Sequence, residues 1–235
     1  ADPWGWLDDG EEQSWTDVRI EGYGRTITYS IPDRSGTGGA SPRIWPPLEE
    51  GEAVQEIVVP LEAFAEPSLT LGQYIWDRWW GGLLKESGHD YSLNVRAEYV
   101  DDEVALLDLT LGERLRRPIE FRQALYSKPN WESQERGEYF FERFWVKPFE
   151  STGGHDWVVQ NDPNVTHDHV YYSIPISDRH ILEFSFFVRD KRYDWKDDPG
   201  WNARRWALVE QIMNTVRIDP APFSPGSERR ATGRD

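Results

Sequence analysis

The sequence predicts an α+β protein in which a predominantly antiparallel β-sheet is flanked by a few helices. Short runs of apolar residues alternate with polar ones, which is the spacing of strands with one buried face. Breaks containing Gly, Asp or Pro separate neighbouring runs and are typical of hairpins. Apolar residues at helical spacing occur in few segments, so we expect fewer helices than strands.

The first predicted elements are a hairpin, a loop and a short strand. Residues 16–20 and 25–31 alternate in polarity, and the Gly22-Tyr23-Gly24 break between them predicts a hairpin. Residues 32–52 are rich in Pro and Gly, which predicts a long surface loop. Residues 57–59 are apolar and end at a proline, which predicts a short strand.

The middle of the chain predicts a helix, a hairpin and a second helix. Thr70 is placed to cap a helix whose apolar residues recur at helical spacing, namely Leu71, Tyr74, Ile75, Trp79 and Leu83. Residues 91–99 alternate strictly and are expected to form a hairpin with residues 104–111. Pro118 stands where a first helical turn would begin, so residues 119–126 predict a short helix.

The C-terminal part repeats the strand pattern. Strands are predicted at 139–146, closed by Pro148, and at 156–160, 169–176 and 180–189. In the last of these, one face carries Leu182, Phe184 and Phe186, whereas Glu183 and Ser185 are expected to face solvent.

A helix and a short strand end the predicted domain. Asp198-Pro199 supplies a cap and first turn for a helix with one apolar stripe, formed by Ala203, Trp206, Val209, Ile212 and Met213. Residues 216–218 are expected to return as a strand. We therefore predict a single α+β domain over 15–219, with two lobes meeting near residue 128 as the alternative. An exposed arm over 1–14 precedes it, and a disordered tail over 220–235 follows.

Composition and charge exclude several classes of function. The chain has no Cys, so disulfides, thiolate metal sites and thiol catalysis are not available. Its 26 basic and 42 acidic residues give a net charge of −16, which disfavours nucleic acid and anionic membrane surfaces as partners. No apolar run approaches the roughly 20 residues of a membrane span. The chain opens on Ala-Asp-Pro without Met, which we interpret as a mature product after removal of a signal peptide, hence periplasmic or secreted.

Three histidines form the candidate metal site. His167 and His169 would lie on one face of an extended segment, and His155 could add a third ligand for a divalent metal. The alternative is a polar loop and strand start, because no HExxH-type helical pair supports a metal. If this alternative holds, no cofactor is expected.

No catalytic residues are assigned. Glu183 is the carboxylate to inspect for acid/base chemistry, and the alternative is a solvated strand face. A nucleophile elbow, a phosphate-binding Gly-rich loop and a dinucleotide fingerprint are all missing from the sequence.

The 13 tryptophans indicate a different kind of site. Exposed indole rings stack on sugars and also act as anchors in protein interfaces. Polar, loop-like segments carry the candidate binding residues, Trp45, Trp131, Trp195 and Trp201.

The segment 180–218 consists of a long aromatic strand, an acidic loop with proline, an amphipathic helix and a short closing strand. In this order of elements it resembles the end of PsbP-like α/β/α domains. The resemblance implies an antiparallel sheet flanked by helices and a role as an exported accessory or interaction protein. It implies no catalytic or binding residue.

The function we predict is that of an exported, non-catalytic binding or inhibitory protein that recognises another protein, for example as an immunity protein against a toxin or hydrolase. A carbohydrate-binding or carbohydrate-active protein is the first alternative. A metal-dependent enzyme that uses the three histidines is the second.

Overall fold

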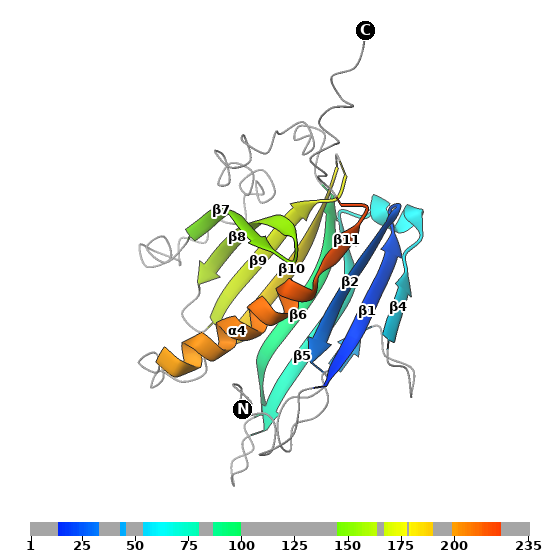
Figure 1. Ribbon diagram of the computed structural model, residues 1–235. Helices are drawn as coiled ribbons and strands as arrows, with labels where there is room; N and C mark the ends of the chain where they lie inside the picture. The colour runs from blue at the N-terminus through cyan, green and yellow to red at the C-terminus, as the bar shows by residue number, and fades with distance from the viewer. Residues whose placement is uncertain are drawn as a thin grey trace.

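The computed structural model describes residues 14–32, 43–45, 54–79, 87–99, 145–163, 167–177, 179–189 and 199–221. These residues form eleven strands, one 3-10 helix and one α-helix, arranged as two sheets with the α-helix beside them (Figure 1). The predicted strand 104–111 and helix 119–126 lie outside the described residues. So do the arm, apart from Ser14, and the tail, apart from Pro220 and Ala221.

The smaller sheet has four strands in the order β11-β2-β1-β4. Its strands are β1 (Trp15–Gly22), β2 (Arg25–Pro32), β4 (Val54–Val58) and β11 (Arg217–Asp219). The predicted hairpin is confirmed, because β1 and β2 pair antiparallel around Tyr23 and Gly24, which both have positive φ, 53° and 69°. Such a two-residue turn matches the twist of the strands that it joins. The strand β4 pairs parallel to β1.

The larger sheet has seven strands in the order β3-β5-β6-β10-β9-β8-β7. Every neighbouring pair in it is antiparallel. The strands are β3 (Arg43–Trp45), β5 (Ser68–Trp79), β6 (Ser87–Tyr99), β7 (Trp145–Thr152), β8 (His155–Pro163), β9 (His167–Pro175) and β10 (His180–Arg189). The predicted, mostly antiparallel sheet is therefore confirmed, whereas the α+β class stays a prediction.

The predicted helix from Thr70 to Leu83 is wrong, because Ser68–Trp79 is strand β5. A bulge between Thr70 and Gly72 inserts Leu71 into the ladder with β6. Leu71 and Tyr74 are consequently both buried at a spacing of three residues, which imitates a helix. Glycine fits at position 72 because a Cβ there would lie 2.7 Å from the hydroxyl oxygen of Tyr74.

Two further predictions near prolines and loops need correction. The predicted loop 32–52 contains the short strand β3, whose residues pair with β5. The strand predicted to end at Pro148 continues through it as β7, with an irregularity in the ladder between Lys147 and Glu150. Proline has no N–H to donate, so a strand tolerates it where the regular pairing is interrupted.

The predicted pairing of residues 91–99 is also corrected. Those residues lie in β6, as expected, but β5 pairs with one edge of β6 and β10 with the other. The partners of β6 are thus strands that are distant in the sequence, and not the next segment of the chain.

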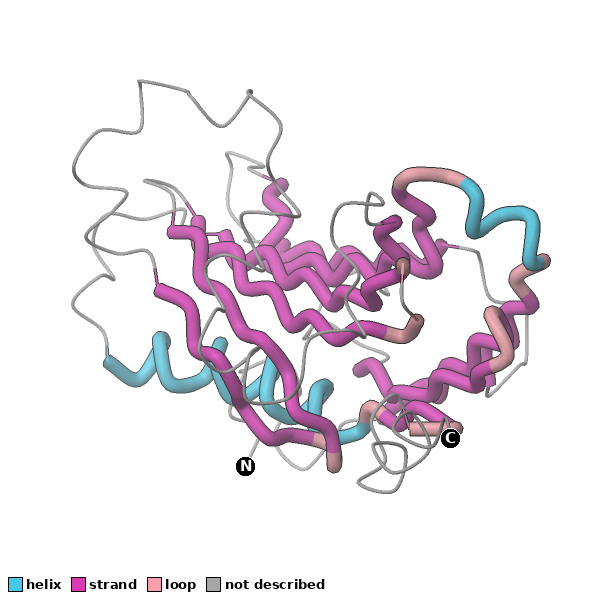
Figure 2. The backbone as a smooth tube through the Cα atoms, turned by 90° about the horizontal axis from the view of Figure 1, so that it is seen from above, coloured by secondary structure: helices cyan, strands magenta, loops and turns pink. Residues whose placement is uncertain are grey.

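The helix α4 (Pro199–Thr215) and the four-stranded sheet lie side by side against one face of the seven-stranded sheet (Figure 2). The predicted apolar stripe of this helix is confirmed at Val209, Ile212 and Met213, which are buried. Side chains from both sheets and the helix form one hydrophobic cluster. At its centre the ring of Phe184 contacts Tyr29 and Trp157 edge-on, with centroid distances of 5.2 and 5.8 Å.

Candidate functional site

The tryptophans of the predicted binding site that the structure describes lie on different elements, a strand and a helix. Trp45 is the last residue of β3, opposite Gln73 of β5, and Trp201 lies in the first turns of α4. Both therefore lie in regular structure and not in loops. Their side chains, and Trp131 and Trp195 altogether, fall outside the described residues. Recognition of a carbohydrate by these rings stays a prediction.

The three candidate metal ligands are not brought together as a triad. His169 on β9 is opposite Asp162 of β8, which is seven residues further along that strand than His155. A strand rises about 3.3 Å per residue, so the two histidines are roughly 20 Å apart. His167 pairs with Arg189, and its side chain is outside the described part. Within the described ranges, no group of three His, Asp or Glu residues could hold a metal ion.

His155 instead joins two elements of the fold. Its Nε2 accepts a hydrogen bond from the backbone N–H of Ile218 at 3.1 Å, which requires an unprotonated nitrogen. Burial lowers the pKa of His155, and the nearby positive charge of Arg217 lowers it further, against a smaller opposite effect of Asp156. The imidazole is thus kept neutral where the β7–β8 hairpin meets β11.

The tip of that hairpin fits closely against the end of α4. Gly153 has a φ of +62°, and a Cβ there would lie 2.7 Å from the carbonyl oxygens of Met213 and Val216. The Arg217 guanidinium donates to the carbonyl oxygen of Gly153 at 3.1 Å. His155 and Arg217 together hold the hairpin, the helix end and β11 in one position.

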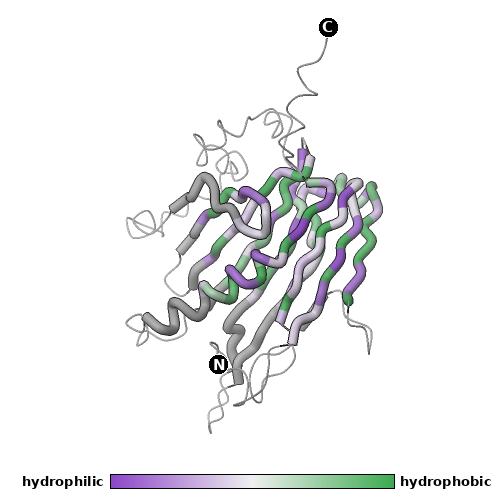
Figure 3. Tube along the Cα trace, viewed as in Figure 1, coloured by the Kyte–Doolittle hydropathy of each residue, from purple (hydrophilic) through white to green (hydrophobic). Residues whose placement is uncertain are grey.

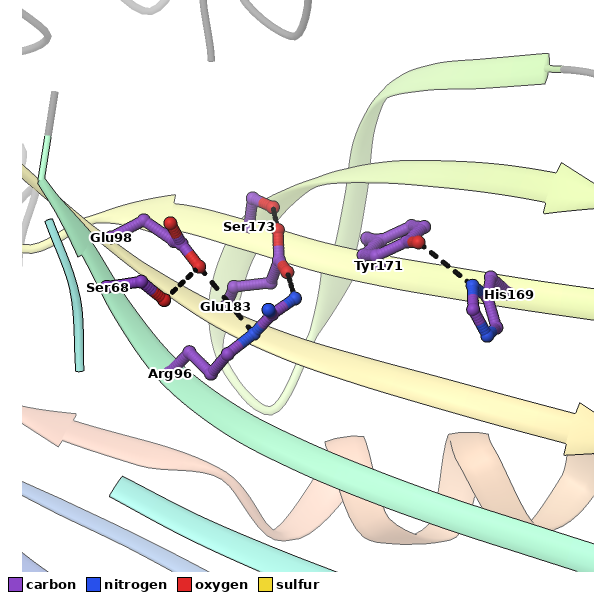
Figure 4. Close-up of polar contacts among 7 residues, drawn as sticks. All are labelled: Ser68, Arg96, Glu98, His169, Tyr171, Ser173 and Glu183. Carbon is purple, nitrogen blue, oxygen red and sulfur yellow. Dashed lines mark hydrogen bonds and ion pairs between the residues drawn. The ribbon is translucent and has the colours of Figure 1, made fainter. Parts of the chain in front are cut away.

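Glu183, the candidate acid/base residue, does not face solvent as predicted. Its side chain is 1% exposed, and it lies between Arg96 of β6 and Ser173 of β9 (Figure 4). Arg96 Nη2 donates to Glu183 Oε1 at 2.8 Å, and the Ser173 hydroxyl is 3.4 Å from Oε2. A buried carboxylate is tolerated where a cation and hydrogen-bond donors compensate its charge.

The same outward face of the seven-stranded sheet carries further polar contacts (Figure 4). Arg96 Nε lies 3.6 Å from Glu98 Oε1, which also accepts a hydrogen bond from the Ser68 hydroxyl at 2.8 Å. Buried polar residues continue this face at Gln160, Ser173 and Ser185. We call Arg96, Glu98, Ser173 and Glu183 the outer-face cluster. Since Arg96 links carboxylates of two strands, the cluster connects β6, β9 and β10.

Sequence reasoning missed His180, which the structure places at a buried junction. Its Nε2 donates to the carbonyl oxygen of Phe64 at 2.9 Å, and its Nδ1 is hydrogen-bonded to the Ser177 hydroxyl at 3.0 Å. Its ring also packs against Tyr23 at a centroid distance of 4.6 Å. Phe64 belongs to the 3-10 helix η1 (Leu61–Ala65), so His180 fixes η1 to the start of β10. A lone histidine at a strand start gave no signal of these contacts.

The segment from β4 to η1 exposes apolar side chains at the outer edge of the smaller sheet. Val54, Val58 and Leu61 are 41%, 79% and 67% exposed, and they are the exposed large hydrophobic residues of the described chain. Figure 3 shows β4 at the edge of the four-stranded sheet that lies away from α4, and exposed residues alternate along it with less exposed ones. We call Val54 to Leu61 the β4 edge segment.

The comparisons with known proteins do not assign a family. No family model, curated protein or solved structure matches the chain. The resemblance of 180–218 to PsbP-like domains therefore stays a prediction. Among the described residues, no helix combines the length and the apolar character that crossing a membrane requires.

Proposed function

We propose that this chain is an exported, non-catalytic protein that binds another protein, and that the β4 edge segment is its contact surface. The observation that carries the proposal is the exposure of Val54, Val58 and Leu61 within one short segment. Single exposed apolar residues are ordinary, but several in one place are typical of an interaction site.

The segment is held in a fixed conformation, which favours recognition. The Val59 N–H donates to the Glu21 carbonyl oxygen at 2.8 Å, and Phe64 is buried in the core at 4% exposure. His180 holds the Phe64 carbonyl from the other sheet. A surface ordered before binding loses little conformational entropy when a partner docks.

The buried ionisable groups support a role without catalysis. Glu183 is bound by Arg96 and covered from solvent. The hydroxyls of Tyr29 and Tyr74 lie 2.5 Å apart in the core, where burial raises the pKa of each phenol. Glu183 contacts Arg96, and Tyr29 contacts Tyr74. These buried positions favour structural roles, because a catalytic group must reach its substrate.

Photo-crosslinking tests the proposal. The residues replaced one at a time by p-benzoylphenylalanine are Val58, Leu61 and, as a control, the exposed Glu210 of α4. We expect the first two positions to crosslink one protein in an extracytoplasmic extract of the source cells, and excess unlabelled chain to prevent it. The captured protein is then purified, and its affinity is measured for the wild type and for Val58→Asp.

Tight binding by the wild type, weakened about tenfold or more by Val58→Asp, supports the proposal. Equal crosslinking from position 210, or equal affinities of the two chains, contradicts it. Recovery of the native chain from the cytoplasmic fraction contradicts the export.

A further inference from the structure

We infer that the edge of β4 that no described strand pairs with binds an extended segment of the partner as an additional strand, with an apolar, a basic and an apolar side chain at alternate positions. This inference rests on the proposed function and names the partner chemistry of the same surface. Strand addition gives affinity through the backbone and specificity through alternate side chains.

The backbone of β4 is oriented for such an addition. In a parallel ladder, alternate residues direct both their N–H and C=O groups toward the partner strand. Val59 donates to Glu21 of β1, so Ile57 and Gln55 also face β1. Val54, Glu56 and Val58 therefore direct their amides away from β1. Within the described part of the chain, β4 is the end of its sheet and no strand pairs with that side.

The side chains of the same three residues define what the added strand would carry. Val54, Glu56 and Val58 are exposed and share the outward face of the sheet, because strand residues alternate between faces. Directly opposite residues of adjacent strands have Cβ atoms about 5 Å apart and interact in pairs. Two apolar side chains of the partner would cover the valines, and a Lys or Arg between them would pair with Glu56.

The charge around this edge favours a basic segment. No Lys or Arg occurs between Arg43 and Arg78 in the sequence. Arg19 of β1 stands opposite Glu56, but its guanidinium is bonded to the Glu21 carboxylate at 2.8 Å. The acidic residues of that interval are Glu49, Glu50, Glu52, Glu56, Glu62, Glu66 and Asp77. Glu62 and Glu66 are exposed beside the edge, as Glu56 is within it. Unlike charges accelerate association and select among partners.

The same charge disfavours pairing between two copies of this chain. An antiparallel pairing of two β4 strands centred on Glu56 would place two carboxylates opposite each other, which is destabilising. Proline at position 60 and the short length of β4 limit the edge further. These features disfavour pairing of β4 with a second copy of itself and favour pairing with a short basic strand.

A synthetic peptide tests the inference directly. The full chain is titrated with the end-blocked heptapeptide Thr-Val-Thr-Lys-Thr-Val-Thr, and with the same peptide carrying Glu in place of Lys. We expect the Lys peptide to bind about tenfold more tightly, since the central charge faces Glu56. Amide hydrogen exchange measured by NMR should slow at Val54, Glu56 and Val58 when the Lys peptide is bound, because those N–H groups become hydrogen-bonded.

Three variants separate strand addition from general attraction. Val58→Pro removes one outward N–H that β1 does not use and keeps an apolar side chain, so the fold is retained while peptide affinity falls about fivefold or more. Glu56→Lys should reverse the preference toward the Glu peptide. Glu210→Lys makes the same change in net charge on α4 and should leave both affinities unchanged within about twofold. Thermal unfolding checks that each variant is folded.

The inference is overturned if neither peptide binds, if the amides of β4 exchange at the same rate with and without peptide, or if Val58→Pro binds as well as wild type. If the crosslinked partner still binds wild type and Val58→Pro equally, the strand mode fails while protein binding stands. If no partner is captured either, the proposed function fails with it.

Discussion

The outward faces of the two sheets differ in the polarity and the exposure of their side chains. On the seven-stranded sheet the outer-face cluster is polar, and its members Ser173 and Glu183 are buried, with Glu183 at 1% exposure, while Arg96 and Glu98 are partly exposed. On the four-stranded sheet the edge strand carries apolar residues that are exposed, with Val58 at 79%. Each face reverses the expected pattern of polar outside and apolar inside.

The reversal has a different physical meaning on each sheet. A buried carboxylate is stable where neighbouring strands supply its partners, so the contacts of Glu183 favour a structural role for the outer-face cluster. Covering an exposed valine with another surface removes apolar area from water, which lowers the free energy. We therefore expect substitutions on the first face to change stability and substitutions on the proposed recognition surface to change binding.

The largest expected effect is that of Arg96→Met on the outer-face cluster. Removing the guanidinium leaves the Glu183 carboxylate buried without its cation, which should lower the free energy of unfolding by about 3 kcal/mol. Urea denaturation at neutral pH measures it. The double variant Arg96→Met with Glu183→Met should be more stable than Arg96→Met alone. If the double variant is less stable than either single variant, the cost of Arg96→Met does not come from leaving Glu183 without its cation.

A smaller effect is expected where the two sheets join. The hydroxyl of Tyr74 lies 2.5 Å from that of Tyr29 and donates to Gln55 Oε1 at 3.1 Å, so it links β5, β2 and β4. Tyr74→Phe should lower the free energy of unfolding by about 1 to 2 kcal/mol, because it removes buried hydrogen bonds and keeps the ring. Gly72→Ala, which places a methyl group 2.7 Å from the same hydroxyl, should also destabilise the fold. Unchanged urea midpoints would contradict this role of the hydroxyl.

A still smaller, pH-dependent effect is expected at His155. Burial lowers the pKa of His155 in the folded chain below the ordinary value of 6.5, so the unfolded chain binds the proton more readily. The contribution of His155 to stability is present above about pH 6.5 and decreases as the pH falls below it, and solvent screening keeps it small for this half-buried group. His155→Gln should show a smaller difference between urea midpoints at pH 7.5 and 5.5. An equal difference in both proteins would contradict the assignment.

The smallest effect on stability is expected at the β4 edge segment. Val58→Thr exchanges an exposed methyl group for a hydroxyl and keeps the branched shape, so the free energy of unfolding should change by less than about 0.5 kcal/mol. Affinity for the crosslinked partner should nevertheless fall about threefold or more. A loss of stability without a loss of affinity would place Val58 with the structural residues and remove the distinction between the two sheets.

Alternation in the sequence predicted the strands that have regular ladders and the helix with a regular stripe. The β1–β2 hairpin, β10 and α4 are where the pattern placed them. Leu71 explains the main failure, because one bulged residue changed the spacing in β5 from that of a strand to that of a helix. Local patterns carry no information about such an insertion.

The candidate site was less accessible to sequence reasoning than the fold. Alternation correctly put Glu183 on the face opposite Phe184, but it could not reveal that this face is covered or that Arg96 is its partner across 87 residues of chain. For the same reason the pattern gave His155 and His169 equal weight, although strand register keeps them apart. The sequence did not predict the exposure of Val58, because residues 57–59 are all apolar and β-branched, as is common in buried strands.

Hydrogen–deuterium exchange of the full chain, with and without the partner captured by crosslinking, shows whether the partner covers the β4 edge segment. We expect slower exchange in peptides that cover Val54 to Leu61, and unchanged exchange over the outer-face cluster. Protection confined to α4 or to β6, β9 and β10, with residues 54–61 unaffected, would contradict it.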